Sequence, residues 1–402
     1  MQGRLLDITR MANRADLRHA TGIDRVELAY ARHLSDGAAP ACFLWRGPRR
    51  WALLDASGLA AMLAVQSGHM DMAPDLLGRI DRRLGRRTAL RAAAESAVRR
   101  QALSLGPPDR VARQAGRRLG QGFEFLSVGH APITAVAYAR LRRAGAGRIS
   151  TMVHDLIPLT HPEECRPGTA ERFLRFLDPA LAASDRIICN SCATRDALQR
   201  MRGASGLPDL TVAHLGTDLP PRAAAPDPGD RPLFVILSTI EPRKNHALLL
   251  DIWERFAATL PADALPHLHI VGRRGWRNED LFARLDASPL VGQCIFEHGD
   301  LGDAALAQLL DRATALLMPS RAEGFGLPVA EARMRGLPVI ASDLPALREV
   351  GGDAALYIPP AERDTWAAAI LEAATADRGP DMAAGGSGDF TWAAHFEQVF
   401  GP

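Results

Sequence analysis

The sequence predicts an α/β protein with two domains, each built around a mainly parallel sheet. Its 402 residues are enough for two domains of roughly 200 residues each. Apolar residues make up 47% of the chain and charged residues 23%, which is typical of a folded globular protein and not of a disordered one. Short β-rich runs alternate with longer helical stretches in both halves, and this alternation is the pattern of layered α/β folds.

In the first half, six short apolar runs are predicted as strands, with helices between them such as 25–33 and 170–182. The strands are predicted at 4–8, 41–45, 123–128, 149–154, 186–189 and 211–215. Residues 1–218 are therefore predicted as one domain. Residues 219–232 contain five prolines and no apolar periodicity, so they are predicted as a linker.

A second alternating series predicts the other domain, residues 233–385. Strands are predicted at 233–237, 268–271, 294–297, 315–318, 339–342 and 355–358, and helices at 246–260, 303–312 and 328–334. The Gly-rich residues 378–388 are predicted as a loop. Within 386–402 a further helix is predicted at 390–400, because Trp392, Phe396 and Phe400 fall on one helical face.

The formal net charge is only +2, but it is unevenly distributed. From Arg79 to Arg118, twelve arginines stand against three acidic residues, a local balance of +9. Leucines and valines share this stretch, namely Leu84, Leu90, Val98, Leu103 and Val111. A basic helical arm is therefore predicted at about 76–120, and such a segment can lie on an anionic membrane surface. The alternative is a solvated arm, and the sequence leaves both open.

No apolar run reaches the ~18–20 residues that span a bilayer, and the first residues lack the layout of a signal peptide. We therefore expect a cytoplasmic protein, soluble or peripheral on the inner face of the plasma membrane. Five cysteines, an odd number, do not indicate a disulfide framework. Cys189 and Cys192 form a C-x-x-C without a second pair, so we interpret them as small buried residues rather than as a zinc or redox site.

Lysine is used once in this chain. Of 48 basic residues, 47 are arginine and the remaining one is Lys244, which follows Arg243 just after the predicted strand 233–237. Ligands of open α/β sheets bind at the carboxyl ends of the strands. Two adjacent cations at such a place suit a diphosphate. The alternative is a basic loop exposed to solvent.

A second polar cluster follows the predicted strand 315–318. Gly324 and Gly326 allow the backbone to approach a ligand closely, and a helix beginning near Pro328 offers free amides to an anion. Two carboxylates flank this loop, Glu323 before it and Glu331 on the helix. Carboxylates accept hydrogen bonds from sugar hydroxyls. The sequence therefore predicts a site for an anionic sugar derivative.

The string from Glu323 to Glu331, EGFGLPVAE, resembles the E-x7-E signature of family 4 of the retaining GT-B glycosyltransferases, the glycosyl transferases group 1. Residues 336–342 and 349–352 are similar to that family's usual continuation. In the first half the resemblance is limited to 21–25, 154–155 and 190–191. The resemblance implies a GT-B fold, in which two Rossmann-like domains face each other across a cleft and a C-terminal helix returns to the N-terminal domain.

The resemblance also implies roles for these residues. Glu331 would bind the donor's ribose and Glu323 the transferred sugar. Gly324 and the backbone amides of Phe325, Gly326 and Leu327 would contact sugar hydroxyls or phosphate. Lys244 and Arg243 would neutralise the leaving diphosphate.

Two further residues are implied in the first half. Gly22 would let the first strand-to-helix turn approach the donor phosphates, although Thr21 could simply cap a helix there. His154 would lie near the reacting sugar, and a structural hydrogen bond is the alternative. Many family members have Gly-Arg where this chain has Ser238 and Thr239. The second phosphate cation is therefore Arg243, Arg273 or Arg274, and the sequence does not choose among them.

The chain lacks an Asp-x-Asp at a predicted strand end, so we expect no metal and no cofactor. The resemblance implies retention by front-face attack, with a hexose moving from a nucleotide sugar to a glycan or lipid-linked acceptor. GDP-mannose is the favoured donor, ahead of UDP-glucose and dTDP-rhamnose, because residues 154–164 are similar to those of bacterial mannosyltransferases. The alternatives are an epimerase or phosphorylase, or a non-catalytic nucleotide-sugar-binding subunit. No nucleic acid partner is predicted.

Overall fold

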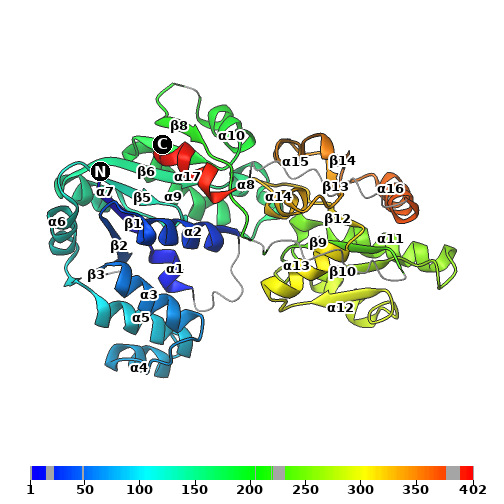
Figure 1. Cartoon of the computed structure of the whole chain (residues 1–402), viewed down its shortest axis with the longest axis horizontal. Helices are drawn as coiled ribbons and strands as arrows, with labels where there is room; N and C mark the ends of the chain where they lie inside the picture. The colour runs from blue at the N-terminus through cyan, green and yellow to red at the C-terminus, as the bar shows by residue number, and fades with distance from the viewer. Residues whose placement is uncertain are drawn as a thin grey trace. The chain divides into compact units, whose positions relative to one another are not determined.

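The computed structural model describes residues 2–14, 22–47, 49–203, 205–218, 220, 231–376 and 390–401 (Figure 1). The predicted loop 378–388, most of the predicted linker and Thr21 lie outside these residues. The chain forms two compact units. The first contains Met1–His154, Glu171–Cys189 and Gln199–Val212, and the second contains Asp155–Ala170, Asn190–Leu198 and Ala213–Pro402.

The first unit is built on an eight-stranded sheet with the order β4-β3-β2-β1-β5-β6-β7-β8. All six predicted strands are present, as β1 Arg4–Asp7, β2 Ala41–Arg46, β5 Phe123–Ser127, β6 Ala146–Val153, β7 Arg186–Cys189 and β8 Asp209–Val212. These six pair in parallel, as predicted. β8 begins and ends earlier than the predicted strand 211–215.

Two strands at one edge of this sheet were not predicted. β3 (Trp51–Leu54) pairs antiparallel with β2, and β4 (Ser104–Gly106) pairs antiparallel with β3. The chain reverses in a turn in which the amide of Gly47 donates to the carbonyl of Arg50. Both strands are short, so their apolar pattern is weak, and their pairing depends on the neighbouring strand.

Helices connect and cover the strands of the first unit. They are α1 Thr9–Asn13, α2 Gly22–Asp36, α3 Ala56–Gln66, α4 Leu76–Arg83, α5 Ala89–Gln101, α6 Pro108–Leu119 and α7 Ala135–Arg143, with most of α9 (Thr169–Ala183) and the end of α10 (Cys192–Arg202). One core cluster joins strand residues such as Leu5, Phe125 and Ile149 to Val111 of α6 and Tyr138 of α7. Figure 1 shows α3, α5 and α4 following one another below the β2–β3 end of the sheet.

The stretch predicted as a basic helical arm at about 76–120 is helical over most of its length, but much of it packs into the first unit. The stretch forms three helices and the strand β4, and Val98 and Val111 are fully buried. Residues 92–98 of α5 are buried, and three of them, Ala93, Ala94 and Ala97, form a cluster with Val65 of α3, so these apolar side chains face the core instead of a surface. Only α4 keeps its apolar side chains exposed.

The second unit is built on a six-stranded sheet, all parallel, with the order β11-β10-β9-β12-β13-β14. Four strands occupy their predicted residues: β9 Leu233–Leu237, β12 Ala315–Met318, β13 Val339–Ser342 and β14 Ala355–Ile358. β10 (His267–Val271) and β11 (Ile295–His298) differ from prediction by one residue. If the six strands are numbered in chain order, their order across the sheet is 3-2-1-4-5-6. This is the doubly wound Rossmann arrangement.

The second unit contains the helices α8 Ile157–Thr160, α11 His246–Thr259, α12 Glu279–Ala287, α13 Asp303–Arg312, α14 Leu327–Met334, α15 Pro345–Gly351, α16 Arg363–Thr375 and α17 Trp392–Phe400. Of these, α11, α12 and α16 contribute to a core cluster that contains two tryptophans. Trp253 and Trp366 are fully buried, and their indole N–H groups donate to the carbonyls of Pro266 and Pro359 at 2.8 and 3.1 Å. None of the described helices is both long and apolar enough to cross a membrane.

Candidate functional site

The two predicted polar clusters meet at one place on the second sheet. β9 and β12 are neighbours, with Phe234 opposite Ala315 and Val235 opposite Leu316. Their connections run to opposite sides of the sheet, which makes the junction of their carboxyl ends the topological switch point. Arg243 and Lys244 follow β9, and the loop beginning at Glu323 follows β12. Sequence reasoning placed both clusters at strand ends, and the strand order makes them adjacent.

Glu323 lies between the two cations. Its Oε1 is 2.5 Å from Nζ of Lys244, and its Oε2 is 3.2 Å from Nη1 of Arg243. All three side chains are largely buried. Burial alone would raise the pKa of Glu323, but Lys244 and Arg243 outweigh it and lower that pKa to about 2. The carboxylate is therefore ionised at neutral pH and faces two positive charges.

The Arg243 guanidinium is oriented by several acceptors. Nη1 donates to the carbonyl of Ala322 at 2.7 Å, and Nη2 donates to Oε1 of Glu241 at 2.8 Å. The other oxygen of Glu241 accepts from the indole of Trp276 at 3.0 Å. Burial opposes the positive charge, but Glu323 and Glu241 outweigh it and raise the pKa of Arg243. The planar group is fixed on three sides.

Arg243 is the arginine that joins this cluster among the three that the sequence left open. Arg274 instead pairs with Asp286 at 2.6 Å and with Glu297 at 2.9 Å, on the side of β11. The side chain of Arg273 is exposed. Arg274 is therefore engaged elsewhere in the unit.

Backbone hydrogen bonds hold the loops after β9 and β12 together. The amide of Arg321 donates to the carbonyl of Arg243 at 2.8 Å. Asn245 adopts the left-handed conformation with φ of 57°, which asparagine tolerates better than most residues, and its side chain donates to the carbonyl of Pro360 at 3.1 Å. Lys244 is thus placed by a short 3-10 turn, Pro242–Lys244, whose end is fixed by the next residue.

The glycine loop leads directly into α14. Gly326 is the N-cap with φ of 97°, and a Cβ there would lie 2.7 Å from Cδ2 of Leu347. The first bonds inside the helix run from the amides of Val329 and Ala330 to the carbonyl of Gly326. The amides before Val329 are therefore not used within the helix. Phe325 is buried and does not point outward.

The carbonyl of Gly324 is held by two hydroxyls of the same unit. Ser191 Oγ and Thr194 Oγ1 donate to it at 2.7 and 3.2 Å. Because a trans peptide group is planar, the amide of Phe325 points away from Ser191 and Thr194. The sequence identified Ser191 only as part of a family landmark, and it gave no sign of Thr194.

Two further carboxylates lie near this region in the fold. Glu331 is buried on α14, which follows β12. Glu349 on α15, quoted only as part of a motif, accepts from the amides of Cys192 and Ala193 at 2.6 and 3.0 Å and caps α10. Burial would raise the pKa of Glu349, but a 2.7 Å hydrogen bond from His214 and the two amides lower it.

Gly22 and His154 belong to the first unit, so they are not among the residues that the second unit brings together. Gly22 is the first residue of α2. The ring of His154 makes a 2.7 Å hydrogen bond to the carbonyl of Val128. A carbonyl can only accept, so Nε2 of His154 holds a proton. The backbone amide of His154 also donates to the ring of His130 at 3.0 Å.

Metal binding was not expected from the sequence. Within the described ranges, no group of three or more His, Cys, Asp or Glu side chains is arranged to hold a metal ion. Cys189 and Cys192 are free thiols, and they belong to different units.

Comparison with known sequences gives a coherent set of relatives. Residues 231–376 match the sequence model of the family described as glycosyl transferases group 1. The serotype-specific mannosyltransferase WbdA of Escherichia coli is 32% identical over 233 residues, which are 54% of this chain and 28% of that protein. The O-antigen chain mannosyltransferase B of Escherichia coli is 33% identical over 149 residues, 37% of this chain and 38% of that protein. The chain thus spans only 28% to 38% of the length of these curated relatives.

Comparison with solved structures covers both units. Sucrose-phosphate synthase from Thermosynechococcus elongatus aligns with a TM-score of 0.63 at 18% identity, covering 99% of this chain and 97% of that one. HepE of Anabaena, in complex with UDP, aligns with a TM-score of 0.62 at 16% identity, covering 99% and 98%. At these identities the likeness concerns the fold. The predicted resemblance is confirmed: the chain has the two-domain GT-B fold, and residues 231–376 match the sequence model of the glycosyl transferases group 1.

Proposed function

We propose that this chain is a retaining, metal-independent hexosyltransferase that uses a nucleotide sugar, with GDP-mannose as the favoured donor. Its acceptor is a glycan or a lipid-linked glycan in the assembly of a surface polysaccharide such as lipopolysaccharide. The proposal rests on one observation: Lys244 and Arg243 both contact the carboxylate of Glu323 at the switch point between β9 and β12.

This arrangement suits the departure of a nucleoside diphosphate. Negative charge develops on the leaving diphosphate while positive charge develops at the anomeric carbon. Cations that are already oriented stabilise the leaving group without further reorganisation. A bound diphosphate competes with Glu323 for Lys244 and Arg243, and Glu323 is then available to accept hydrogen bonds from the sugar hydroxyls.

We assign binding of the nucleoside part of the donor to the loop and helix after β12. We assign Glu331, buried on α14, to the ribose hydroxyls. The amides of Phe325, Gly326 and Leu327 precede the first internal bond of α14 and suit phosphate or sugar oxygens. Gly324 contributes its small size, since its carbonyl is held by Ser191 and Thr194. Two contacts remain predictions from the sequence: Gly22 near the donor phosphates and His154 near the transferred sugar.

The sugar and the acceptor follow from the relatives. Those described above are named mannosyltransferases, and one is named for the O-antigen chain. This supports mannose as the transferred sugar and a growing polysaccharide as the acceptor. Retention, with the departing phosphate accepting the acceptor's proton, is the stereochemistry that the family resemblance implies. A lipid-linked acceptor would bring the enzyme to the inner face of the plasma membrane.

A nucleotide panel followed by a turnover assay tests this function. GDP-mannose, UDP-glucose and dTDP-rhamnose are compared by thermal shift, and GDP-mannose is expected to raise the melting temperature most, because a ligand that binds only the folded state stabilises it. Slow release of GDP from GDP-mannose is then expected with EDTA present, and Lys244→Arg is expected to lower it by about ten-fold or more.

Each arm has an outcome that contradicts the proposal. No shift with any sugar nucleotide contradicts the donor class, and a shift only with UDP-glucose replaces the donor. Activity that EDTA abolishes and Mn²⁺ restores excludes metal independence. Wild-type turnover in Lys244→Arg shows that the ammonium is not specifically required.

A further inference from the structure

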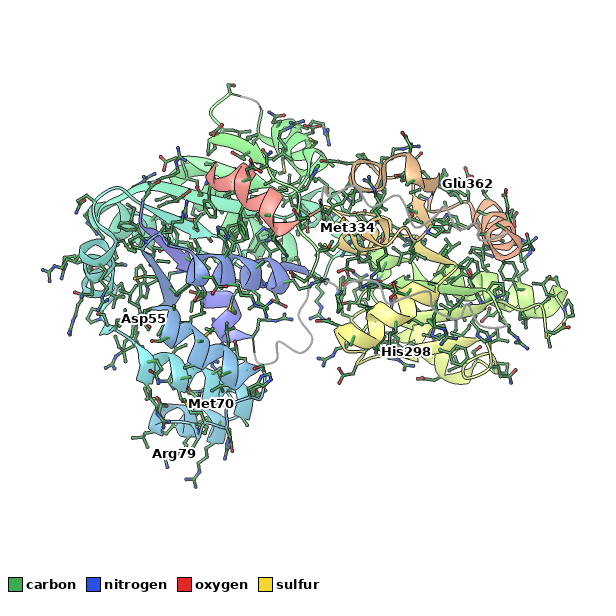
Figure 2. All side chains as sticks on the ribbon, in the orientation of Figure 1. Asp55, Met70, Arg79, His298, Met334 and Glu362 are labelled. Atoms are coloured by element: carbon green, nitrogen blue, oxygen red, sulfur yellow. The ribbon has the colours of Figure 1, made fainter. Side chains whose placement is uncertain are left out.

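Exposed apolar side chains are concentrated in one short segment of the first unit. Nine large hydrophobic side chains are exposed among the described residues, and five of them fall within residues 70–84. These five are Met70, Leu76, Leu77, Ile80 and Leu84, with exposed fractions of 41%, 66%, 52%, 45% and 57%. The other four are scattered over both units. Figure 2 shows side chains projecting outward in this segment, where Met70 and Arg79 are labelled.

The helix α4 presents these side chains because it packs through a glycine. Gly78 is its buried residue, and a Cβ at that position would lie 2.8 Å from Oγ of Ser96 and 3.0 Å from the carbonyl of Ala92, both on α5. At about 100° per residue, the four apolar residues at 76, 77, 80 and 84 fall within an arc of about 100° that lies on the side away from Gly78. The apolar stripe of α4 therefore faces solvent, the reverse of an ordinary surface helix.

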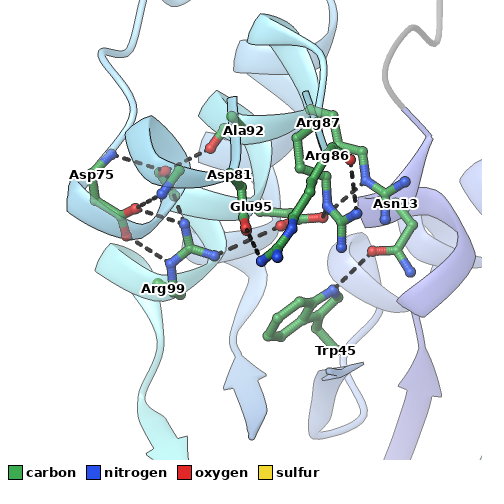
Figure 3. A network of polar contacts seen from close by, with 12 residues as sticks. Asn13, Trp45, Asp75, Asp81, Arg86, Arg87, Ala92, Glu95 and Arg99 are labelled. Atoms are coloured by element: carbon green, nitrogen blue, oxygen red, sulfur yellow. Dashed lines mark hydrogen bonds and ion pairs between the residues drawn. The ribbon is translucent and has the colours of Figure 1, made fainter. Parts of the chain in front are cut away.

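Polar contacts hold α4 on α5 (Figure 3). Asp75 caps α4 by accepting from the amide of Gly78 at 2.8 Å, and it also accepts from Nε and Nη2 of Arg99 at 2.6 and 2.7 Å. The amide of Asp75 donates to Oγ of Ser96 at 3.0 Å. Because these contacts and Gly78 attach the helix, its leucines and isoleucine are not needed for attachment.

The charges around the stripe are positive and mostly uncompensated. Arg79, Arg82 and Arg83 are exposed, and in the part of the chain that the structure describes none of them forms an ion pair. Arg86 has a long contact, 3.9 Å from its Nη1 to Oδ1 of Asp81. The arginines of the neighbouring helix differ, since Arg91 pairs with Glu95 and Arg99 with Asp75. Several exposed apolar side chains and unpaired positive charges thus coincide on α4.

We propose that residues 70–86, here called the α4 face, dock on an anionic lipid surface. The apolar stripe enters the boundary between headgroups and acyl chains, and the flanking arginines contact the lipid phosphates. Charge complementarity selects this occupant, because a second copy of the chain would present the same positive charge to the α4 face. The inference rests on the proposed function only in that a lipid-linked acceptor lies at such a surface.

Vesicle flotation with the full chain tests the proposal. Vesicles of phosphatidylcholine alone are compared with vesicles that also contain phosphatidylglycerol, at low and at high salt. The wild type is expected to float with the anionic vesicles at low salt, and less at high salt. The triple changes Leu76→Ser, Leu77→Ser, Ile80→Ser and Arg79→Glu, Arg82→Glu, Arg83→Glu are each expected to lower vesicle binding by about ten-fold or more.

Two matched controls make the same chemical changes elsewhere. Arg110→Glu, Arg113→Glu, Arg117→Glu alters three exposed arginines of α6, and Val136→Ser, Met201→Ser, Leu356→Ser alters three other exposed apolar residues. Both are expected to keep wild-type binding. Far-UV circular dichroism confirms that each variant is folded.

The outcomes are distinct from those for catalysis. Absence of wild-type flotation, or equal loss in the α6 control, overturns the assignment to the α4 face. Self-association in sedimentation velocity that the serine variant abolishes, without vesicle binding, assigns the α4 face to a second copy instead. GDP release in solution is expected to be unchanged in the α4 variants. If the proposed sugar transfer fails in every assay while flotation follows α4, the docking surface stands without the proposed function.

Discussion

Glu323 is the residue on which the charge balance of the second unit's site depends. A carboxylate buried by itself would be strongly disfavoured, and two buried cations beside each other would repel. Placing the carboxylate between Lys244 and Arg243 satisfies all three groups with contacts of 2.5 and 3.2 Å. Removing Glu323 alone leaves two buried cations without this carboxylate, and removing Lys244 alone leaves Glu323 with one cation. Removing both leaves Arg243 still paired with Glu241.

A double-mutant cycle at this cluster should therefore be strongly non-additive. Lys244→Met and Glu323→Gln are each expected to lower the free energy of unfolding by about 1–3 kcal/mol. The combined variant should lose clearly less than the sum of the two, while remaining inactive. Urea unfolding of the four proteins measures the coupling. Simple additivity would show that the close contact contributes little to folding.

At the scale of an element, α14 depends on how its first turn is reached. Gly326 takes φ of 97°, a conformation that a side chain makes unfavourable, and Cδ2 of Leu347 lies only 2.7 Å from the position of a Cβ there. Leu347 is fully buried and cannot move far. The glycine therefore sets the direction in which the helix leaves the loop and where its free amides point.

Gly326→Ala should disturb both stability and donor binding. We expect a loss of about 1–3 kcal/mol in the free energy of unfolding, from the left-handed backbone and the contact with Leu347, together with weaker nucleotide-sugar binding. The matched control is Gly299→Ala, where φ is not positive and a Cβ would meet no atom within 4 Å. That control should stay within about 0.5 kcal/mol of wild type. Equal effects in both variants would remove the special role of Gly326.

Prediction of the fold succeeded where a strand has its own strong signal. β9, β12, β13 and β14 were predicted at their observed residues, because each is a short apolar run bounded by polar or turn-forming residues. β3 and β4 were missed because four and three residues give little pattern, and their place depends on pairing with β2. The prediction of a basic arm did not anticipate the packing of α5 and α6 for a related reason. Its apolar spacing is the same whether a helix faces a membrane or, as α5 and α6 do, a core.

The sequence allowed residues that follow strands to be placed correctly, but it did not reveal long-range contacts. The positions of Lys244 and Glu323 after their strands sufficed to place them together once the strand order was known. The bonds of Ser191 and Thr194 to Gly324 connect residues 133 and 130 positions apart. A single sequence contains no local signal for such a contact.

For the whole molecule, buried histidines limit the pH range of stability. Loss of water lowers the pKa of His246 to about 3 and that of His269 to about 4, and it lowers the pKa of His130 well below its usual value. In the unfolded chain these groups bind a proton near pH 6.5. Because the folded pKa is the lower one, stability is complete above about pH 6.5 and falls as the pH decreases toward the folded pKa.

The melting temperature should therefore decrease between pH 7.5 and pH 5. His246 is 2% exposed, and it should contribute about 1.4 kcal/mol of lost stability for each pH unit below about 6.5. Thermal unfolding at several pH values measures this, and His246→Gln should make the dependence less steep. A melting temperature that is flat down to pH 5 would contradict the assignment of these histidines as buried and neutral.

The meeting of β9 with β12 also determines when the site can form. Lys244 and Glu323 are 79 positions apart along the chain. Between these two residues the chain passes through β10 and β11, which lie on the other side of β9 from β12. Contacts between residues so far apart in sequence form slowly, because the entropy cost of closing a long loop comes before the stabilisation that the contact provides. During synthesis the loop after β9 has Arg243, Lys244 and Glu241 but not Glu323, so the cluster around Glu323 can form only after β12 has been made.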